Sequence, residues 1–202
     1  MPWNVTVVEK TAPRQDVCRV VVHCGVKAIA ENAFRDWTSL GDVAFELGSQ
    51  LETVGAHAFA GTALERFDAP KNLKAIHAGA FMNCGELKAV RLNEGLESLR
   101  KGVFQNSGVE TIYFPSTLRE MRKRALFNCK NLQKVLVAEG CTVDVKNRVG
   151  PGVSVETVAP ERPVGGDELS SSSVQIELED EEMLRKKLEE RDAQIEELRQ
   201  QI

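Results

Sequence analysis

The sequence predicts a solenoid, a fold in which short units stack along one axis and each unit buries apolar side chains against its neighbours. Three observations predict it. A six-residue phrase that mostly ends in Ala-Phe occurs five times, its copies lie 22 to 25 residues apart, and shorter apolar phrases fill each interval. A repeat of this length is typical of solenoid proteins.

The recurring phrase holds an apolar residue, three variable positions, a small residue and a large apolar residue. Its copies are residues 29–34, 54–59, 76–81, 99–104 and 121–126. We expect this phrase to turn a corner of the coil as a helical or irregular turn.

Each repeat holds two further apolar phrases, and the first of them predicts a short strand. The first covers residues 64–69, 87–92, 109–114 and 132–137, and its last two apolar residues are two positions apart. That spacing is the period of a half-buried strand. The second phrase covers residues 51–54, 73–76, 96–99 and 118–121. Turn-forming residues separate the phrases, so each repeat should make about three passes around a flattened coil.

In these residues the repeat resembles the BspA-type leucine-rich repeat. The best copy is Ile76-His-Ala-Gly-Ala-Phe81-Met-Asn-Cys84-Gly-Glu-Leu87-Lys-Ala-Val90-Arg-Leu92. The copies after Phe59 and Phe104 resemble the family's shorter variant, which lacks the Cys and one residue. The resemblance implies a leucine-rich-repeat solenoid with parallel strands on one face. It also implies binding and adhesion rather than catalysis, and many members are exported surface proteins.

The ends of the chain differ from the repeats. We assign residues 1–16 to an N-terminal cap, 17–140 to the solenoid and 141–159 to a C-terminal cap in which residues 141–145 and 153–158 alternate like strands. Residues 160–173 are rich in Pro, Gly and Ser and predict a flexible linker. The first clear strand is expected at residues 17–22, in an incomplete leading repeat.

Residues 174–202 predict an amphipathic α-helix that forms a coiled coil. Apolar residues fall on alternating a and d heptad positions, and Arg191 takes the remaining d position. This pattern favours oligomerisation and allows a homodimer through the helix. The predicted oligomerisation residues are Leu184, Leu188, Ile195, Leu198 and Ile202.

Charge and hydropathy exclude two classes of partner. The net charge is −4, of which residues 167–202 carry −7 and the rest of the chain +3. A surplus this small does not predict nucleic-acid binding, which usually needs a dense basic face. No run approaches the roughly 18 apolar residues of a transmembrane helix, so no membrane insertion is expected.

No catalytic, metal or cofactor site is predicted. His23, His57 and His77 occupy different places in the repeat and therefore should not cluster. Cys84 and Cys129 share a place but lie two layers apart, about 9.6 Å for strands spaced about 4.8 Å, which exceeds disulfide reach. Cys18 and Cys24 flank the first strand, and a zinc site there would need two more ligands that the sequence does not identify.

The cysteines and the N-terminus favour the cytoplasm. Five scattered cysteines without paired CxxC spacing suit a reducing compartment. The first residues also lack the basic and apolar regions of a signal peptide. The alternative, which the family resemblance implies, is an exported surface protein whose leader is missing from this chain.

The predicted binding surface is the strand face. Between the buried residues of each strand, the others should point outward and stack into two columns, forming a mixed, mildly basic patch with an exposed Tyr and Leu. Tyr and Arg often anchor interfaces. The alternative is that these side chains are only solvated and bind no partner. The predicted binding residues are Arg66, Asp68, Arg91, Thr111, Tyr113, Lys134 and Leu136.

The sequence therefore predicts a non-enzymatic scaffold that binds a protein on its strand face. The C-terminal helix would link copies and raise the avidity for a repeated partner. An exported adhesin of the same repeat family is the alternative, and an enzyme is the third-ranked reading.

Overall fold

The computed structural model describes residues 17–150 and 152–160. All of them belong to the first of two compact units, residues 1–163. The predicted N-terminal cap, nearly all of the predicted linker and the heptad segment, including Leu184, Leu188, Ile195, Leu198 and Ile202, lie outside the described residues.

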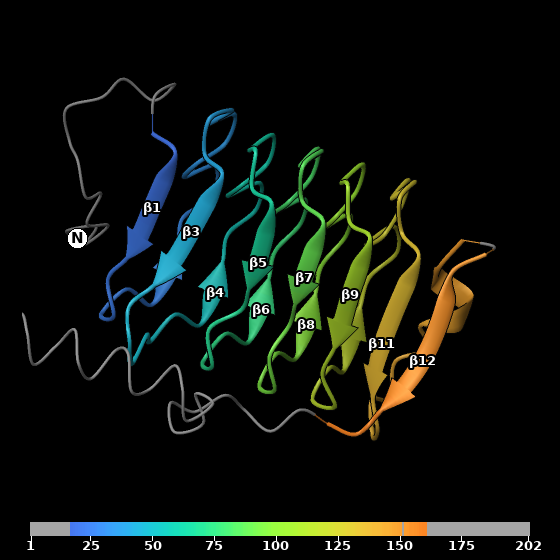
Figure 1. Cartoon of the computed structure of the whole chain (residues 1–202). Helices are drawn as coiled ribbons and strands as arrows, with labels where there is room; N and C mark the ends of the chain where they lie inside the picture. Colours follow the sequence, from blue (N-terminus) through green and yellow to red (C-terminus); the bar gives the residue numbers. More distant parts are fainter. Residues whose placement is uncertain (1–16, 151, 161–202) are drawn as a thin grey trace, which may run out of the picture. The chain divides into compact units, whose positions relative to one another are not determined.

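The repeats form two ladders of parallel strands (Figure 1). The first ladder contains β1 (Arg19–Val22), β3 (Asp42–Phe45), β5 (Arg66–Asp68), β7 (Ala89–Arg91), β9 (Thr111–Phe114), β11 (Lys134–Ala138) and β12 (Ser154–Val158). The second contains the two-residue strands β2 (Ala28–Ile29), β4 (Thr53–Val54), β6 (Ala75–Ile76), β8 (Ser98–Leu99) and β10 (Glu120–Met121). The predicted solenoid of short parallel strands is confirmed.

The first ladder is divided between β3 and β5. β1 and β3 form one sheet, and the strands from β5 to β12 form another. Eleven positions separate the start of β3 from the start of β4, whereas nine separate β5 from β6. The longer turn after β3 projects Leu47, which is 92% exposed. Phe45 at the division is only half-buried, and its ring meets that of Phe67 edge-on, with the centroids 6.0 Å apart.

The corner of each repeat is an irregular turn and not a helix. Two residues in every corner have φ between 53° and 71°, which no right-handed helix contains. Glycine and asparagine reach this region at little cost, and they occupy most of these positions. The first position holds Asn32, His57, Gly79, Gly102 and Arg124, and the second holds Asp36, Gly61, Asn83, Asn106 and Asn128.

Hydrogen bonds within and between layers satisfy the backbone of the corner. Alternate amides donate to the next layer, as when Phe59 N donates to Ala80 O at 2.8 Å. The amides between them donate within the layer, as when Ala60 N donates to His57 O at 3.2 Å. A buried backbone needs such partners because an unpaired buried amide is costly.

Stacked phenylalanines fill the core behind the corners. The ring centroids of Phe34, Phe59, Phe81 and Phe104 lie 5.1, 5.3 and 5.5 Å apart in order, and the planes differ by only 9° to 15°. Leu126 takes the fifth place in this column and is nearly buried. Each ring therefore covers its neighbour and is covered in turn.

The C-terminal end extends only the first ladder. β12 pairs in parallel with β11, which confirms the strand predicted within residues 153–158. The strand predicted at residues 141–145 is wrong, because this segment contains no strand and leads into a 3-10 helix, η1 (Lys146–Arg148). The alternating apolar side chains of this segment, Cys141, Val143 and Val145, instead pack against the core without forming a strand.

Candidate functional site

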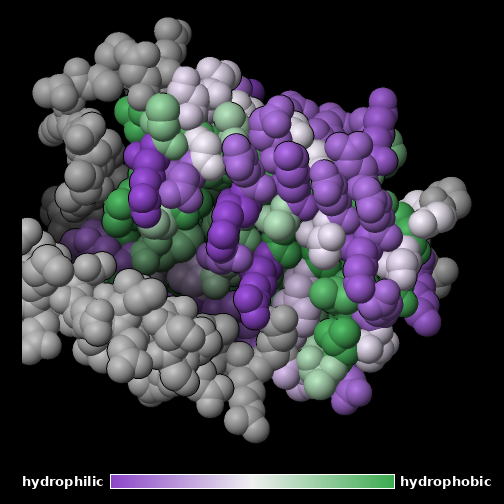
Figure 2. All heavy atoms as spheres, in the orientation of Figure 1, coloured by the Kyte–Doolittle hydropathy of each residue, from purple (hydrophilic) through white to green (hydrophobic). Residues whose placement is uncertain are grey.

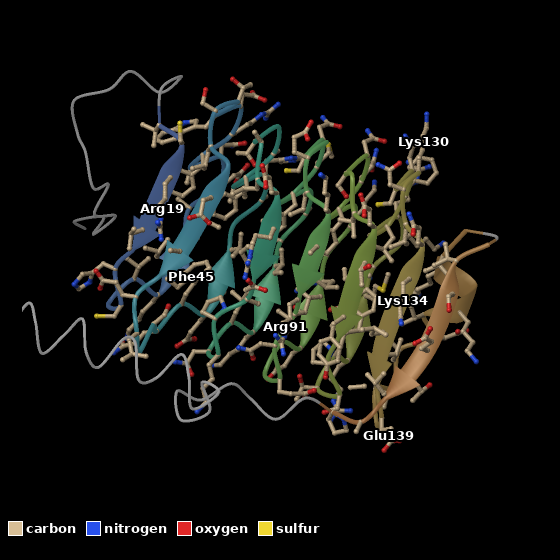
Figure 3. The ribbon with its side chains drawn as sticks, in the orientation of Figure 1. Arg19, Phe45, Arg91, Lys130, Lys134 and Glu139 are labelled. Carbon is tan, nitrogen blue, oxygen red and sulfur yellow. The ribbon has the colours of Figure 1, made fainter. Side chains whose placement is uncertain are left out.

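We define the strand face as the surface formed by the outward side chains of β1, β3, β5, β7, β9, β11 and β12. Strand register stacks these side chains into two columns. One column holds Arg66, Ala89, Thr111 and Lys134, and the other holds Asp68, Arg91, Tyr113 and Leu136. All seven predicted binding residues thus belong to one ladder, and Figure 3 shows Arg19, Arg91 and Lys134 spread along it.

Charged side chains on the strand face are largely paired. Arg66 donates two hydrogen bonds to Asp68, and this interaction raises the pKa of the Arg66 guanidinium. Near the N-terminal end, Arg19 and Asp42 form an ion pair at 3.0 Å. Such exposed pairs contribute only about 0–1 kcal/mol to stability. They fix the orientation of the side chains that a partner would meet.

An acid from the last strand makes the face less basic than predicted. Lys134 Nζ lies 2.8 Å from an oxygen of Glu156, which β12 contributes. The hydrogen bond from Lys134 lowers the pKa of the Glu156 carboxyl. The sequence did not place Glu156 on this face, because the register of β12 was not evident from the repeat.

Tyr113 is not the exposed anchor that the sequence predicted. It is only 4% exposed, and its hydroxyl donates to Glu94 Oε1 at 3.0 Å. The same carboxylate accepts hydrogen bonds from Ser116 N and from Ser116 Oγ at 2.7 Å. Tyr113 thus supports the turn after β9, and its role on the face is to position neighbours.

The middle of the strand face presents smaller or half-buried side chains between the charge pairs. Ala89 and Arg91 are exposed and Thr111 is half-buried, while the half-buried Leu136 lies farther along, on β11 opposite Glu156. Figure 2 shows that hydrophilic side chains predominate on this side of the molecule, with hydrophobic ones in smaller groups between them. The strand face is thus a mixed surface of charged, polar and apolar side chains.

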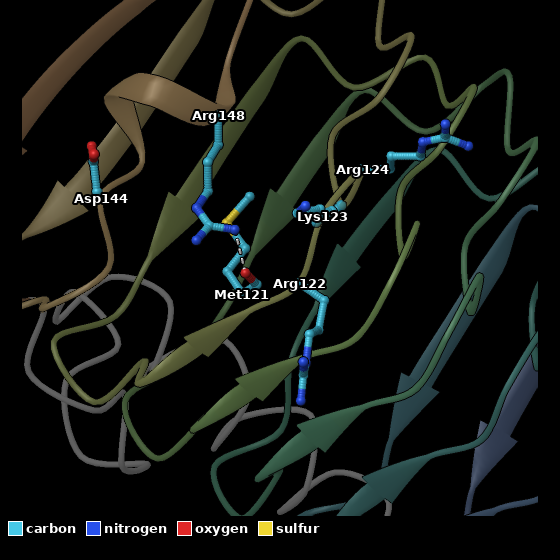
Figure 4. Close-up of a pocket in the computed structure, with 7 residues that line it drawn as sticks. Met121, Arg122, Lys123, Arg124, Asp144 and Arg148 are labelled. Atoms are coloured by element: carbon cyan, nitrogen blue, oxygen red, sulfur yellow. Dashed lines mark hydrogen bonds between the residues drawn. The ribbon is translucent and has the colours of Figure 1, made fainter.

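A cleft at the C-terminal end carries four cations but does not gather them. It has a volume of about 400 Å³ and is lined by Met121, Arg122, Lys123, Arg124, Ala125, Asp144 and Arg148. Arg148 donates to the Met121 carbonyl, while Arg122 and Arg124 point in different directions (Figure 4). Because the cations diverge, we assign no anion site here.

Two pairs of side chains form a buried polar ladder that the sequence did not reveal. Cys84 Sγ and Thr62 Oγ1 both donate to the Phe59 carbonyl, at 3.1 and 2.8 Å. Cys129 and Ser107 bind the Phe104 carbonyl in the same way, at 3.0 and 2.7 Å. Thr62 and Ser107 therefore take the place of the Cys in the shorter repeats. The sequence could have indicated this role, because Thr62 and Ser107 both carry a hydroxyl three residues after the phenylalanine of their repeat.

The thiols in this ladder are structural. Burial raises the pKa of the Cys84 thiol and of the Cys129 thiol, so both stay protonated and weakly nucleophilic. None of the five cysteines, all of which the structure describes, forms a disulfide. Among the described residues, one group of metal-ligand types, His23, Cys24 and Glu46, lies close together at the ends of β1 and β3.

The repeat identifies the family. The model of the BspA type leucine rich repeat region matches residues 16–133 in six copies. The chain therefore belongs to the BspA-type leucine-rich-repeat family. The match begins at residue 16 and so includes the leading repeat that carries β1, beyond the five Ala-Phe phrases. No curated protein matches the chain.

Solved bacterial leucine-rich-repeat structures share the fold. The pneumococcal vaccine antigen PcpA is 26% identical, with 61% of this chain and 31% of that chain covered and a TM-score of 0.58. A leucine-rich-repeat protein from Eubacterium ventriosum is 21% identical, with 63% of this chain and 34% of that chain covered and a TM-score of 0.58. The T. pallidum protein TpLRR is 24% identical, with 78% of this chain and 82% of that chain covered and a TM-score of 0.58. The chain spans about a third of the length of the first two.

The described part of the chain contains no helix that is long and apolar enough to span a membrane. Leucine-rich repeats are a known interaction scaffold, which agrees with the class predicted from the sequence.

The buried thiols predict a loss of stability at alkaline pH. Thiols of the unfolded chain ionise near their ordinary pKa of 9.0, whereas burial keeps Cys84 and Cys129 protonated in the folded chain. The unfolded state then binds fewer protons, so the free energy of unfolding falls as the pH rises above about 9. Urea unfolding at about pH 7 and about pH 10 measures this fall.

The matched control for this experiment is a Cys84→Thr/Cys129→Ser double variant. The shorter repeats have Thr62 and Ser107 at the equivalent position, so the new hydroxyls should keep the hydrogen bonds to the Phe59 and Phe104 carbonyls. We expect a smaller alkaline loss than in the wild type. An equal loss in the two proteins would show that the thiols do not cause it.

Proposed function

We propose that the solenoid binds a protein partner through its strand face and has no enzymatic activity. The observation that carries this proposal is the common register of β5 to β12, which holds one outward side chain from each layer in line with the next. Small-molecule sites are usually enclosed and concave. An open surface of this kind suits a macromolecule.

Six of the predicted residues are proposed to contact the partner directly. The charge pairs at both ends of the five-stranded sheet would orient the partner and speed its association. The exposed Arg91 lies between them, and Leu136 lies on β11 opposite Glu156. Burial of such side chains by a partner usually supplies most of the binding energy. The contact residues are Arg66, Asp68, Arg91, Thr111, Lys134 and Leu136, with Tyr113 holding the β9 turn in place.

Oligomerisation is part of the proposal. The heptad pattern of residues 174–202 would join copies of the chain and present several strand faces to a repeated partner. Two linked modules bind such a partner with higher avidity, because the second binding event is intramolecular.

A strand-face variant tests the binding proposal. Arg91→Glu/Leu136→Asp changes two accessible side chains, and Lys101→Glu/Arg119→Glu is a matched control that changes two exposed cations outside this face. After cross-linked capture from extracts of the source cells, we expect one protein to be retained by the wild type and the control. The strand-face variant should retain at least about tenfold less of it, since hot-spot changes cost about 2 kcal/mol or more.

Circular dichroism must show equal folding of the three proteins. Retention of the same protein by both variants would place binding elsewhere on the chain. Equal loss from both variants would show that general charge, and not the strand face, governs capture.

As a second candidate, we propose that this binding takes place at the cell surface. It is supported by the 26% identity to PcpA, which is described as a vaccine antigen. The cytoplasmic location predicted from the cysteines gains no support from the similar structures.

Protease treatment of intact cells that express the full chain tests the surface candidate. We expect the chain to be cleaved in intact cells, while a cytosolic marker protein remains whole. Protection of the chain until the cells are lysed would contradict a surface location and leave the cytosolic prediction standing.

A further inference from the structure

Three side chains with metal-binding atoms meet at one edge of the first two layers. His23 and Cys24 directly follow β1, and Glu46 directly follows β3. β1 and β3 are parallel, with Val22 opposite Phe45, so the residues after both strands reach the same edge. One ring nitrogen, the thiol sulfur and one carboxylate oxygen lie within 4.8 Å of one another.

Backbone amides hold two of these groups in place. Cys24 N donates to Glu46 Oε2 at 2.9 Å, and Gly25 N donates to His23 Nδ1 at 3.1 Å. In the neutral ring Nδ1 therefore holds the lone pair and Nε2 holds the proton, so Nδ1 would exchange the Gly25 N–H for the metal. Nδ1 also lies 4.0 Å from Cys24 Sγ. Nε2 lies 3.7 Å from Glu46 Oε2. Metal-binding carboxylates are commonly oriented by such a hydrogen bond, as Cys24 N orients Glu46 here.

The turns that carry the ligands are themselves tied together. Val26 N donates to His23 O at 3.0 Å, and Gln50 N donates to Cys24 O at 2.8 Å. The second of these bonds links the turn after β1 to the longer turn after β3. The three ligands therefore stand on two turns whose backbones are already connected.

We propose that His23, Cys24 and Glu46 bind one Zn²⁺ ion through Nδ1, the Sγ thiolate and a carboxylate oxygen. Zinc prefers nitrogen, thiolate and carboxylate ligands in tetrahedral geometry, in which ligand atoms lie about 3.3–3.7 Å apart. The present separations reach up to 4.8 Å, so the side chains would rotate toward one another to hold one ion. The fourth position is open to water.

Charge and access favour this ion. The thiolate and the carboxylate together balance the two positive charges of Zn²⁺, and a sulfur ligand selects zinc over magnesium or calcium. The side chains of His23 and Glu46 are 43% and 40% exposed, so an ion can reach them from solvent.

The site belongs to the first two layers alone. His23 and Glu46 each come two residues after an outward residue of their strand. In the layers of β7, β9 and β11 the corresponding residues are not usual zinc ligands. They are Asn93, Pro115 and Ala138. Bound zinc would join β1 to β3, the pair of strands that is separated from the five-stranded sheet. The ion would thus stabilise the N-terminal layers where the ladder is divided.

Zinc titration of the full chain by calorimetry tests the proposal. We expect one ion per chain, and affinity at least about tenfold weaker after His23→Ala, Cys24→Ser or Glu46→Gln, because each removes one ligand. Cys18→Ser is the matched control, since it removes a thiol at the other end of β1 and should leave the affinity unchanged. With Co²⁺ in place of zinc, a thiolate-to-cobalt absorption band should appear and be absent from Cys24→Ser.

Thermal unfolding gives a second readout. Zinc should raise the melting temperature of the wild type and of Cys18→Ser but not of Cys24→Ser, because an ion that binds only the folded chain stabilises it. If Cys24→Ser fails to fold, Glu46→Gln decides, because that side chain is exposed and its amide oxygen still accepts the Cys24 N–H. The proposal is overturned if the wild type binds no zinc, if the ligand variants retain its affinity, or if Cys18→Ser loses it.

Discussion

Contact between neighbouring layers is the interaction on which this solenoid depends, and the corner of the repeat concentrates it. There, the ring of one phenylalanine lies 5.1 to 5.5 Å from the next, and amides such as Phe81 N donate to the following layer at 2.8 Å. Stacked aromatic pairs contribute about 0.5–1.5 kcal/mol beyond the burial of their area. No single layer could bury these groups alone, so the repeats are stable only as a stack.

The same stacking creates the surfaces to which we assign function. Once the corners fix the spacing of the layers, the strands align in register and their outward residues form columns. The strand face is therefore a consequence of the core and keeps its geometry while its side chains vary. Where the stacking changes, at the longer turn after β3, the ladder divides and His23, Cys24 and Glu46 come together.

Period and burial made most of the fold predictable from the sequence. Each buried position recurs in every layer, so the stacked layers and the strands of the first phrase followed from spacing, while the family resemblance implied their parallel order. The left-handed corner was also signalled, because Gly79, Gly102 and Asn106 stand at positions where only such residues are unstrained. The repeat spacing alone allows either a helical or an irregular turn, and these residues favour the irregular one.

The parts that sequence reasoning missed depend on contacts outside the repeat period. The burial of Tyr113 requires Glu94 to reach it from the preceding turn, and the neutralisation of Lys134 requires Glu156 from an irregular cap. The step of 25 residues between the first two phenylalanines was visible, but its effect on the ladder was not. The three metal-ligand types come from two layers, and only the register of β1 with β3 brings them together.

Urea unfolding of a Phe81→Ala variant tests the dependence on layer contact most directly. Phe81 is fully buried between two other rings, whereas Phe127, in the last corner, is 52% exposed. We expect Phe81→Ala to lower the free energy of unfolding by about 3–5 kcal/mol. The matched Phe127→Ala should lower it by less than about 1 kcal/mol, as is usual for surface changes. Equal losses in the two variants would contradict the view that stacking within the core holds the layers together.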